Sequence, residues 1–277
     1  MAAADRRSLR SRVGPALRAA IGSRTRWMLT EQSDPAAIED LLERLHPRVA
    51  PTGLRRLGPD GDGGYLVPDD LDGIAACFSP GVGTLAGFEM DCAELGLRTH
   101  LADASVDAAP HPDPRLDFRR VFIRAVAGPE AITLEQWVTE LEPDPADELL
   151  LQIDIEGDEW SVLLGTPRPV LERFRIIVAE FHRMQGLLER TACSMQAPVF
   201  EKLLETHVCV HIHPNNCCGT ATNGRVVIPR TAEFTFLRRD RIDLAQAGHA
   251  QLFPHPLDAD CTGRAPLALQ ASMYRAR

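Results

Sequence analysis

Long apolar runs are absent from this sequence. No stretch approaches the roughly 18–20 consecutive apolar residues that a membrane-spanning helix requires, and the first residues lack the apolar segment of a secretory signal. Aromatic residues are also few, at 5% of the chain, yet 44% of its 277 residues are hydrophobic and 25% are charged, as in ordinary globular proteins. A folded chain of this length buries about 70–75% of its unfolded surface, so a core with an interior pocket is expected.

Cysteines are few and irregularly spaced. Their number, seven, is odd, and no CxxC pair occurs, which argues against a disulfide framework. Reduced thiols in a cytoplasmic protein are therefore expected. A zinc site could still combine Cys209 with His211 and His213. The adjacent Cys217 and Cys218 cannot both easily reach one tetrahedral ion, so a polar loop is the favoured role for this segment.

Acidic residues outnumber basic ones beyond the first 30 positions. Those positions hold seven arginines and one acidic residue, so the net charge of −9 for the whole chain corresponds to about −15 for the remainder. An acidic body argues against nucleic acid as a partner, because phosphate binding depends on lysine and arginine. Residues 1–32 are expected to form a basic, flexible leader, with an organelle transit peptide as the alternative.

Short apolar segments alternate with helical patterns from residue 74 onward. Strands are expected at residues 74–78, 97–102, 121–126, 149–153 and 175–181. Helices are expected after Asp34-Pro35, over residues 85–95, after the capping box of Thr133 and Gln136, around residues 160–163 and from residue 200. Residues 207–213 and 233–237 alternate polar and apolar side chains, with a turn at Asn223-Gly224, and predict an antiparallel hairpin. The whole pattern predicts an α/β protein with a mostly parallel sheet.

Glycine and polar residues follow several of these strands. They are the turn Ser79-Pro-Gly-Val-Gly83, Asp103, Asp154-Ile-Glu156 and Glu180-Phe-His182. The carboxyl ends of parallel strands share one edge of a sheet, and ligands of open α/β sheets bind at that edge. We therefore expect these residues to converge on one site.

The glycine turn and Asp103 together indicate a nucleoside-type cofactor. Gly81 and Gly83 let the backbone approach a ligand closely, and Asp103, 20 residues beyond Gly83, is placed to accept hydrogen bonds from ribose hydroxyls. The third glycine of a dinucleotide site and the Gly-Lys-Ser/Thr of a phosphate loop are missing, so neither NAD nor ATP is favoured. An ordinary strand-to-helix turn and a solvent-exposed loop acid are the alternatives.

Carboxylates and a histidine are expected on the same edge. If strand geometry persists to the end of the segment, Asp154 and Glu156 point the same way and could hold a cation, orient a hydroxyl or act as a general base. His182 could accept a proton, or complete a divalent metal site with Asp154 and Glu180. A purely structural histidine is the alternative.

Two further segments could border the site. The turn-rich residues 58–64, with Asp62 and the following Tyr65, could fold over a cofactor or form a simple surface turn. Asn215 and Asn216 could present amide groups to a polar substrate.

Five segments, taken in order, resemble the FkbM-type methyltransferase domain. They are Asp62-Gly-Gly-Tyr65, Gly81-Val-Gly83, Thr133-Leu-Glu-Gln-Trp137, Gln152-Ile-Asp-Ile-Glu-Gly-Asp-Glu159 and Val178-Ala-Glu-Phe-His182. The resemblance covers about residues 55–240. It implies a Rossmann-like sheet of seven strands, mostly parallel with an antiparallel last strand. The implied domain spans residues 33–240 with an N-terminal helical cap, and residues 241–277 form an extension.

The resemblance also implies a reaction, which is S-adenosylmethionine-dependent methylation of a hydroxyl on a sugar or natural-product-like small molecule. The implied cofactor-binding residues are Gly81, Val82, Gly83, Asp103 and Asp62. The resemblance places Asp154 and Glu156 beside the methyl group and the acceptor. We expect Asp154, Glu156 and His182 to be the catalytic residues, with Asp154 or His182 as the base. A divalent ion such as Mg²⁺, held by Asp154, Glu180 and His182, could assist by lowering the pKa of the acceptor hydroxyl.

The sequence differs from enzymes of the methyltransferase fold at the start of the glycine turn. Related enzymes usually carry an acidic residue where Ser79-Pro80 stands, so the contact with the amino group of the cofactor must come from elsewhere, from Glu89 or Asp62. Two alternative functions follow. The chain could be a non-catalytic binding module that retains the fold, or a metal-dependent hydrolase that uses His211 and His213.

Overall fold

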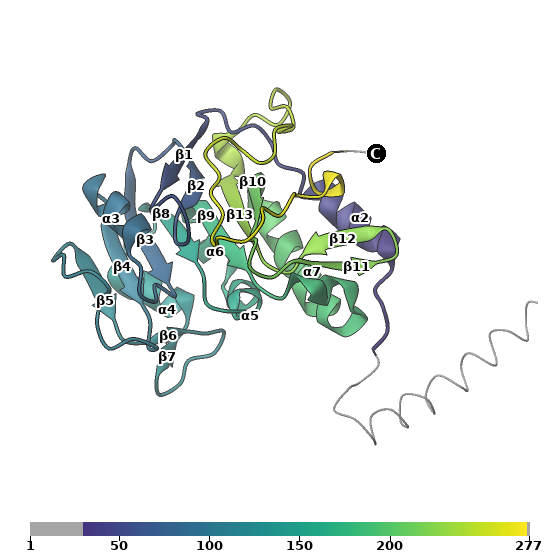
Figure 1. Ribbon diagram of the computed structural model, residues 1–277. Helices are drawn as coiled ribbons and strands as arrows, with labels where there is room; N and C mark the ends of the chain where they lie inside the picture. Colours follow the sequence, from purple (N-terminus) through teal and green to yellow (C-terminus); the bar gives the residue numbers. More distant parts are fainter. Residues whose placement is uncertain (1–29, 276–277) are drawn as a thin grey trace, which may run out of the picture.

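A seven-stranded sheet forms the centre of the molecule. The computed structural model describes residues 30–275 (Figure 1), so residues 1–29 of the expected leader lie outside the described part. The sheet has the order β10-β13-β9-β8-β3-β4-β5. Its strands, in chain order, are β3 (Ile74–Pro80), β4 (Arg98–Ala102), β5 (Leu116–Arg119), β8 (Glu148–Ile153), β9 (Phe174–Phe181), β10 (His207–Pro214) and β13 (Ala232–Arg238).

Only one strand of this sheet runs against the others. β3 pairs in parallel with β4 and β8, and the pairs β4–β5 and β8–β9 are also parallel. β13 lies between β9 and β10 and is antiparallel to both. The expected α/β, Rossmann-like sheet with an antiparallel last strand is therefore confirmed. Its strand order reverses between β3 and β8, because the chain builds outward from β3 on one side and from β8 on the other.

The central strands are buried on both faces, which explains their nearly continuous apolar sequences. In β8, Leu149 and Leu151 belong to the same apolar cluster as Trp137. Leu150, between them, packs on the opposite face with Phe88. Helices cover both faces. They are α2 (Pro35–Arg44), α3 (Gly87–Glu94), α4 (Leu134–Leu141), α5 (Glu159–Gly165), α6 (Arg168–Leu171) and α7 (Arg190–Thr206).

Two helices begin where their capping residues predict. The Asp34 side chain accepts a hydrogen bond from the Ala36 N–H at 3.1 Å, and Pro35 occupies the first position of α2. At the start of α4, the Gln136 N–H donates to Thr133 Oγ1 at 3.1 Å and the Thr133 N–H donates to Gln136 Oε1 at 3.0 Å. This reciprocal pair is the predicted capping box.

Three predicted elements differ in extent from those observed, namely the strand at 121–126, the helix at 85–95 and the helix from residue 200, which begins ten residues earlier as α7. The strand expected at 121–126 is only the short β6 (Phe122–Ile123), which pairs with β7 (Ala131–Ile132). The seventh sheet strand is β5, where the sequence predicted no strand. β5 is an edge strand with one apolar face, so it carries no apolar run. Helix α3 begins at Gly87, which leaves Leu85 and Leu95 exposed outside it.

The predicted hairpin exists, but its turn lies elsewhere. β10 and β13 are antiparallel neighbours, whereas Asn223-Gly224 turns between the inserted strands β11 (Thr220–Asn223) and β12 (Val226–Pro229). Every residue of β10 is buried despite its alternating sequence. The C-terminal segment (yellow in Figure 1) returns to this strand, where Asp258 contacts His211 at 2.8 Å.

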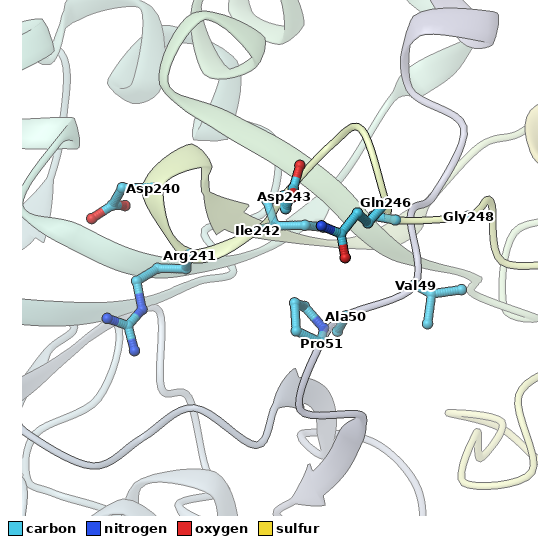
Figure 2. A pocket seen from close by; sticks show the side chains of 10 residues that line it. Val49, Ala50, Pro51, Asp240, Arg241, Ile242, Asp243, Gln246 and Gly248 are labelled. Atoms are coloured by element: carbon cyan, nitrogen blue, oxygen red, sulfur yellow. The ribbon is translucent and has the colours of Figure 1, made fainter.

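The remaining elements are small. β1 (Leu54–Leu57) and β2 (Tyr65–Pro68) form an antiparallel ribbon around the 58–64 turn, and short 3₁₀ helices lie at Met184–Leu188, Arg239–Arg241 and Ala271–Met273. Within residues 30–275, none of the helices combines the length and apolarity needed to cross a membrane. A cavity of about 660 Å³, lined by residues 49–51 and 240–248, lies beyond the end of β13 (Figure 2). Because β13 is antiparallel, this cavity is at the opposite edge of the sheet from the carboxyl ends of β3 and β8.

Candidate functional site

The turn after β3 lies directly against the end of β8. Gly81 has a φ of +90°, and its N–H donates to the Ala102 carbonyl at 2.9 Å. A β-carbon at this position would stand 1.6 Å from the backbone carbonyl oxygen of Asp154. Only glycine permits both the positive φ and this close approach. The strand-order reversal therefore brings Gly81 and Asp154 into contact.

Two hollows meet at this contact. One, of about 250 Å³, is lined by residues that include Asp62, Tyr65, Val82, Glu89 and Gln152. The other, of about 280 Å³, is lined by residues that include Ala102, Asp103, Phe122, Ile123 and Arg124. Four residues line both hollows, namely Gly81, Gly83, Asp154 and Glu156. The structure thus brings seven of the predicted site residues to one two-lobed cleft, at the strand-order reversal where α/β sheets bind ligands.

Asp103 is held by two backbone groups in the second lobe. Its Oδ2 accepts a hydrogen bond from the Gly83 N–H at 2.9 Å, and its Oδ1 accepts one from the Ser105 N–H at 2.7 Å. The residue is buried. Each carboxylate oxygen keeps further acceptor capacity, so the fixed side chain can still accept hydrogen bonds from a ligand.

Glu89 supplies a carboxyl group beside Ser79, which stands where related enzymes usually carry an acidic residue. Ser79 Oγ lies 2.5 Å from Glu89 Oε1 and 2.7 Å from Gln152 Oε1, and all three residues are buried. Burial raises the pKa of Glu89 to about 7, although the hydrogen bond from Ser79 opposes this shift. Glu89 and Asp62, the two residues that the sequence offered for the contact with the amino group of the cofactor, both line the first lobe. Ser79 therefore serves to hold Glu89, which arrives from α3.

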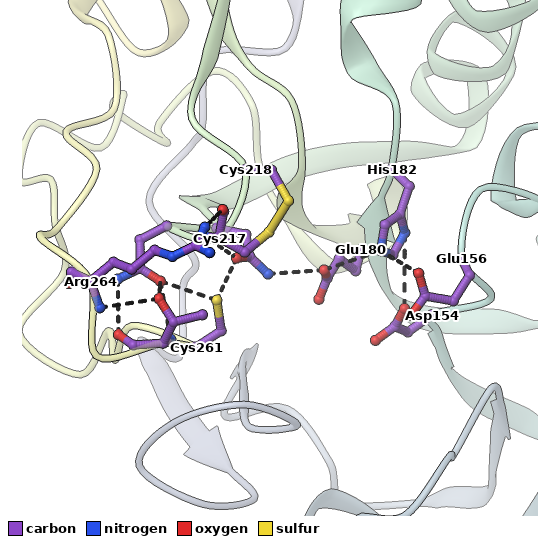
Figure 3. The surroundings of a disulfide bond; sticks show 11 residues. Asp154, Glu156, Glu180, His182, Cys217, Cys218, Cys261 and Arg264 are labelled. Atoms are coloured by element: carbon purple, nitrogen blue, oxygen red, sulfur yellow. Dashed lines mark hydrogen bonds and ion pairs between the residues drawn. A yellow bond between two sulfur atoms is a disulfide. The ribbon is translucent and has the colours of Figure 1, made fainter.

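Asp154, Glu180 and His182 form a compact group, which we call the acid–histidine cluster (Figure 3). One potential metal-ligand atom from each residue lies within 4.8 Å of the others. His182 Nε2 lies 3.5 Å from Glu180 Oε1, and His182 Nδ1 lies 4.0 Å from Asp154 Oδ1. Asp154 belongs both to this cluster and to the cleft.

Each member of the acid–histidine cluster is fixed by a neighbour outside it. The Tyr65 hydroxyl donates to Asp154 Oδ2 at 3.1 Å, and Asn215 Nδ2 donates to Glu180 Oε1 at 3.0 Å. His182 Nδ1 lies 3.1 Å from Glu159 Oε1, which also accepts the N–H groups of residues 155 and 157. The predicted Tyr65 and Asn215 thus border the site through these contacts.

Burial and like charge dominate the electrostatics of the acid–histidine cluster. Burial and the neighbouring Glu180 raise the pKa of Asp154 well above its usual value, and burial and Glu233 raise the pKa of Glu180 to about 8. Burial lowers the pKa of His182, but its hydrogen bond to Glu159 and the surrounding carboxylates outweigh this effect and raise it to about 9. These groups therefore favour an added positive charge.

Glu156 does not continue the geometry of β8. The strand ends at Ile153, and Glu156 has a φ of +58°, in the left-handed region. Strand alternation therefore does not orient it, contrary to the expectation from its spacing. Its side chain is 89% exposed, yet its carboxylate still lies 3.5 Å from His182 Nε2 and lines both lobes.

The zinc alternative for Cys209, His211 and His213 is not assembled, because these three side chains form no group with metal-ligand spacing within residues 30–275. Asp258 lies 2.8 Å from His211 Nε2 and 3.3 Å from His213 Nδ1, so one carboxylate from the C-terminal segment engages both imidazoles. Within residues 30–275, the acid–histidine cluster is the only group of three or more His, Cys, Asp or Glu side chains whose ligand atoms lie close enough to share a metal ion. No local pattern predicts this contact, because Asp258 lies 45 residues beyond His213.

The expectation of reduced thiols throughout is also wrong for one pair. Cys217 and Cys218 form a disulfide (Figure 3). The free cysteines are Cys77, Cys92, Cys193, Cys209 and Cys261. The neighbouring Asn216 is not available to a substrate, because its Nδ2 donates to the carbonyls of Thr262 and Arg264 at 3.0 Å each. It anchors the C-terminal segment instead.

Comparison with known proteins assigns no family. The sequence matches no protein-family model and no curated protein. The class that the structure defines is therefore the Rossmann-like α/β fold, and any functional assignment depends on the site.

Proposed function

We propose that this protein is an S-adenosylmethionine-dependent methyltransferase that methylates a hydroxyl of a sugar or natural-product-like small molecule. The observation that carries the proposal is the two-lobed cleft at the strand-order reversal, with Gly81 and Asp154 at its centre. Open α/β sheets bind nucleoside-type ligands at this point.

The two lobes fit a ligand with two chemically different ends. The first lobe offers the carboxyl groups of Glu89 and Asp62 to a cationic amino group. The second offers the fixed Asp103 carboxylate to ribose hydroxyls, and the side chains of Phe122 and Ile123 to an apolar ring. S-Adenosylmethionine has these two ends and joins them through its sulfonium. The residues of the cleft therefore fit this cofactor.

When bound, the cofactor supplies a methyl group activated by the positive sulfonium. The residues of the cleft would hold the acceptor hydroxyl beside this methyl group, which the acceptor oxygen would take from the sulfonium. Asp154 or His182, which lie 4.0 Å apart, would receive the proton of the hydroxyl. His182 does so only in its neutral form, above its pKa of about 9. Asp154 lines both lobes and Glu156 lies beside it, so both carboxylates adjoin the proposed methyl position.

Calorimetric titration with S-adenosylmethionine tests the proposal. We expect saturable binding of one cofactor per chain, followed by release of S-adenosylhomocysteine when a hydroxyl acceptor is added. Absence of binding at about 1 mM cofactor, the upper range of common Michaelis constants, would overturn it. Cofactor binding without methyl transfer to any of a panel of sugars and polyphenols would instead favour the non-catalytic binding module.

A further inference from the structure

The acid–histidine cluster contains the donor set of a divalent cation site. Asp154 and Glu180 supply carboxylate oxygens, and His182 supplies an imidazole nitrogen. Asp154 follows β8, while Glu180 and His182 lie at the end of the neighbouring β9, so the sheet itself sets their spacing. The side chains of Asp154 and His182 remain 24% and 17% exposed, which leaves an approach for an ion.

The groups around the cluster orient its donor atoms. Tyr65, Asn215 and Glu159 each bind one member, and they come from three different segments of the chain. Glu159 engages the Nδ1 atom of His182 and leaves Nε2 directed toward Glu180. Metal-binding histidines are commonly oriented through their second nitrogen in this way.

A further buried carboxyl group independently indicates a cation. Glu233 on β13 stands directly opposite Glu180 on β9, so both side chains point to the same face of the sheet. Glu233 is only 8% exposed, and no group among residues 30–275 donates a hydrogen bond to its carboxyl. Its electrostatic neighbours are the carboxyl groups of Asp258, Glu180 and Asp154, together with the guanidinium of Arg56. Like charges opposite one another destabilise a sheet, and a bound cation would relieve this repulsion.

We propose that the acid–histidine cluster binds one divalent cation of the Mg²⁺ or Mn²⁺ class, coordinated by Asp154, Glu180 and His182, with Glu233 as a buried countercharge. Such ions prefer oxygen-rich sites and keep several positions for water or substrate. If the proposed function holds, the acceptor hydroxyl would occupy one of these positions, and the ion would lower the pKa of that hydroxyl. Ion binding itself does not depend on the methyltransferase assignment.

Titration of the full chain with MnCl₂ and with MgCl₂, without cofactor, tests the site. We expect one ion per chain. Glu180→Gln should weaken binding more than tenfold, and Tyr65→Phe, which removes only an orienting hydrogen bond, should weaken it about tenfold. The matched control is Glu142→Gln, because Glu142 is also a buried carboxylate beside a histidine, His100, but stands at the end of α4. It should bind the ion as the wild type does.

Absence of ion binding at about 10 mM, beyond the weakest calcium modules, would overturn the site. Equal affinity in the wild type and in both Glu180→Gln and His182→Gln would also overturn it. If these variants do not fold, electron spin-echo spectroscopy of wild-type protein with Mn²⁺ decides the matter. A coordinated imidazole nitrogen supports the site, whereas a purely oxygen environment contradicts it. A protein that binds S-adenosylmethionine but no divalent ion would overturn this metal site alone. A protein that binds the ion but no S-adenosylmethionine would overturn the methyltransferase assignment alone.

Discussion

The α-carbon of Gly81 is packed against the backbone carbonyl of Asp154, so closely that an added β-carbon would lie 1.6 Å from that oxygen. This contact joins the end of β3 to the end of β8. It also fixes the boundary between the two lobes of the cleft, since both residues line both lobes. Backbone geometry at one residue therefore controls the shape of the proposed cofactor site.

Gly81→Ala should destabilise the protein strongly. The new methyl group must displace the backbone at residue 154, and we expect a loss of at least about 3 kcal/mol in the free energy of unfolding. Gly96→Ala is the matched control, because Gly96 has a similar φ of +88° but no atom within 4 Å of its β-position. It should lose only about 1–2 kcal/mol from backbone strain. Equal losses in urea unfolding would show that the contact with Asp154 does not matter.

Asp103→Asn should weaken the binding of S-adenosylmethionine while the protein stays folded. The carboxylate would accept hydrogen bonds from ribose, and each hydrogen bond to a charged group contributes about 1.5–3 kcal/mol, or roughly ten- to hundredfold in affinity. Calorimetric titration measures the change. Asp107→Asn, four residues further on with a side chain that is 97% exposed, serves as the control and should bind as the wild type does. Unchanged affinity in Asp103→Asn would remove Asp103 from the cofactor site.

The sequence predicted the central sheet well because its strands are buried on both faces and carry continuous apolar runs. Residues 149–153 and 175–181 match β8 and β9 to within one residue. The glycine turn, Asp103 and Asp154 could be placed together because each follows such a strand. Edge strand β5 was missed because it has only four residues, too few for a clear alternation, and directly follows a proline-rich stretch.

Contacts between distant segments also escaped prediction. Glu233 faces Glu180 only because β13 inserts between β9 and β10, and this pairing leaves no local signal in the sequence. Asp258 reaches His211 and His213 from the C-terminal segment in the same way. Glu89 lay within a predicted helix, but its approach to Ser79 depends on the packing of α3 against β3.

The disulfide predicts a thiol count. Unfolded protein without reductant should react with a thiol reagent at five cysteines, and after reduction at seven. In the folded protein, Cys193 and Cys261 should react first, because Cys77, Cys92 and Cys209 are buried. Mass spectrometry of the labelled peptides identifies the sites. Seven reactive thiols before reduction would show that Cys217 and Cys218 are not bonded in solution.

Glu89 should make the stability of the protein depend on pH. Burial raises its pKa from 4.5 to about 7, so the folded state binds this proton more tightly than the unfolded chain does. The resulting stabilisation is fully present below about pH 4.5 and is lost as the pH rises through about 7. At about 1.4 kcal/mol for each pKa unit, the loss amounts to at most about 3 kcal/mol.

Glu89→Gln removes this dependence because glutamine does not titrate. Relative to the wild type, the variant should gain free energy of unfolding between about pH 4.5 and about pH 7.5, as measured by urea denaturation at several pH values. Glu94→Gln is the control, since Glu94 is an exposed carboxyl on the same helix. Its unfolding curve should keep the wild-type pH profile. Identical pH profiles for Glu89→Gln and the wild type would mean that Glu89 is not held as a buried acid.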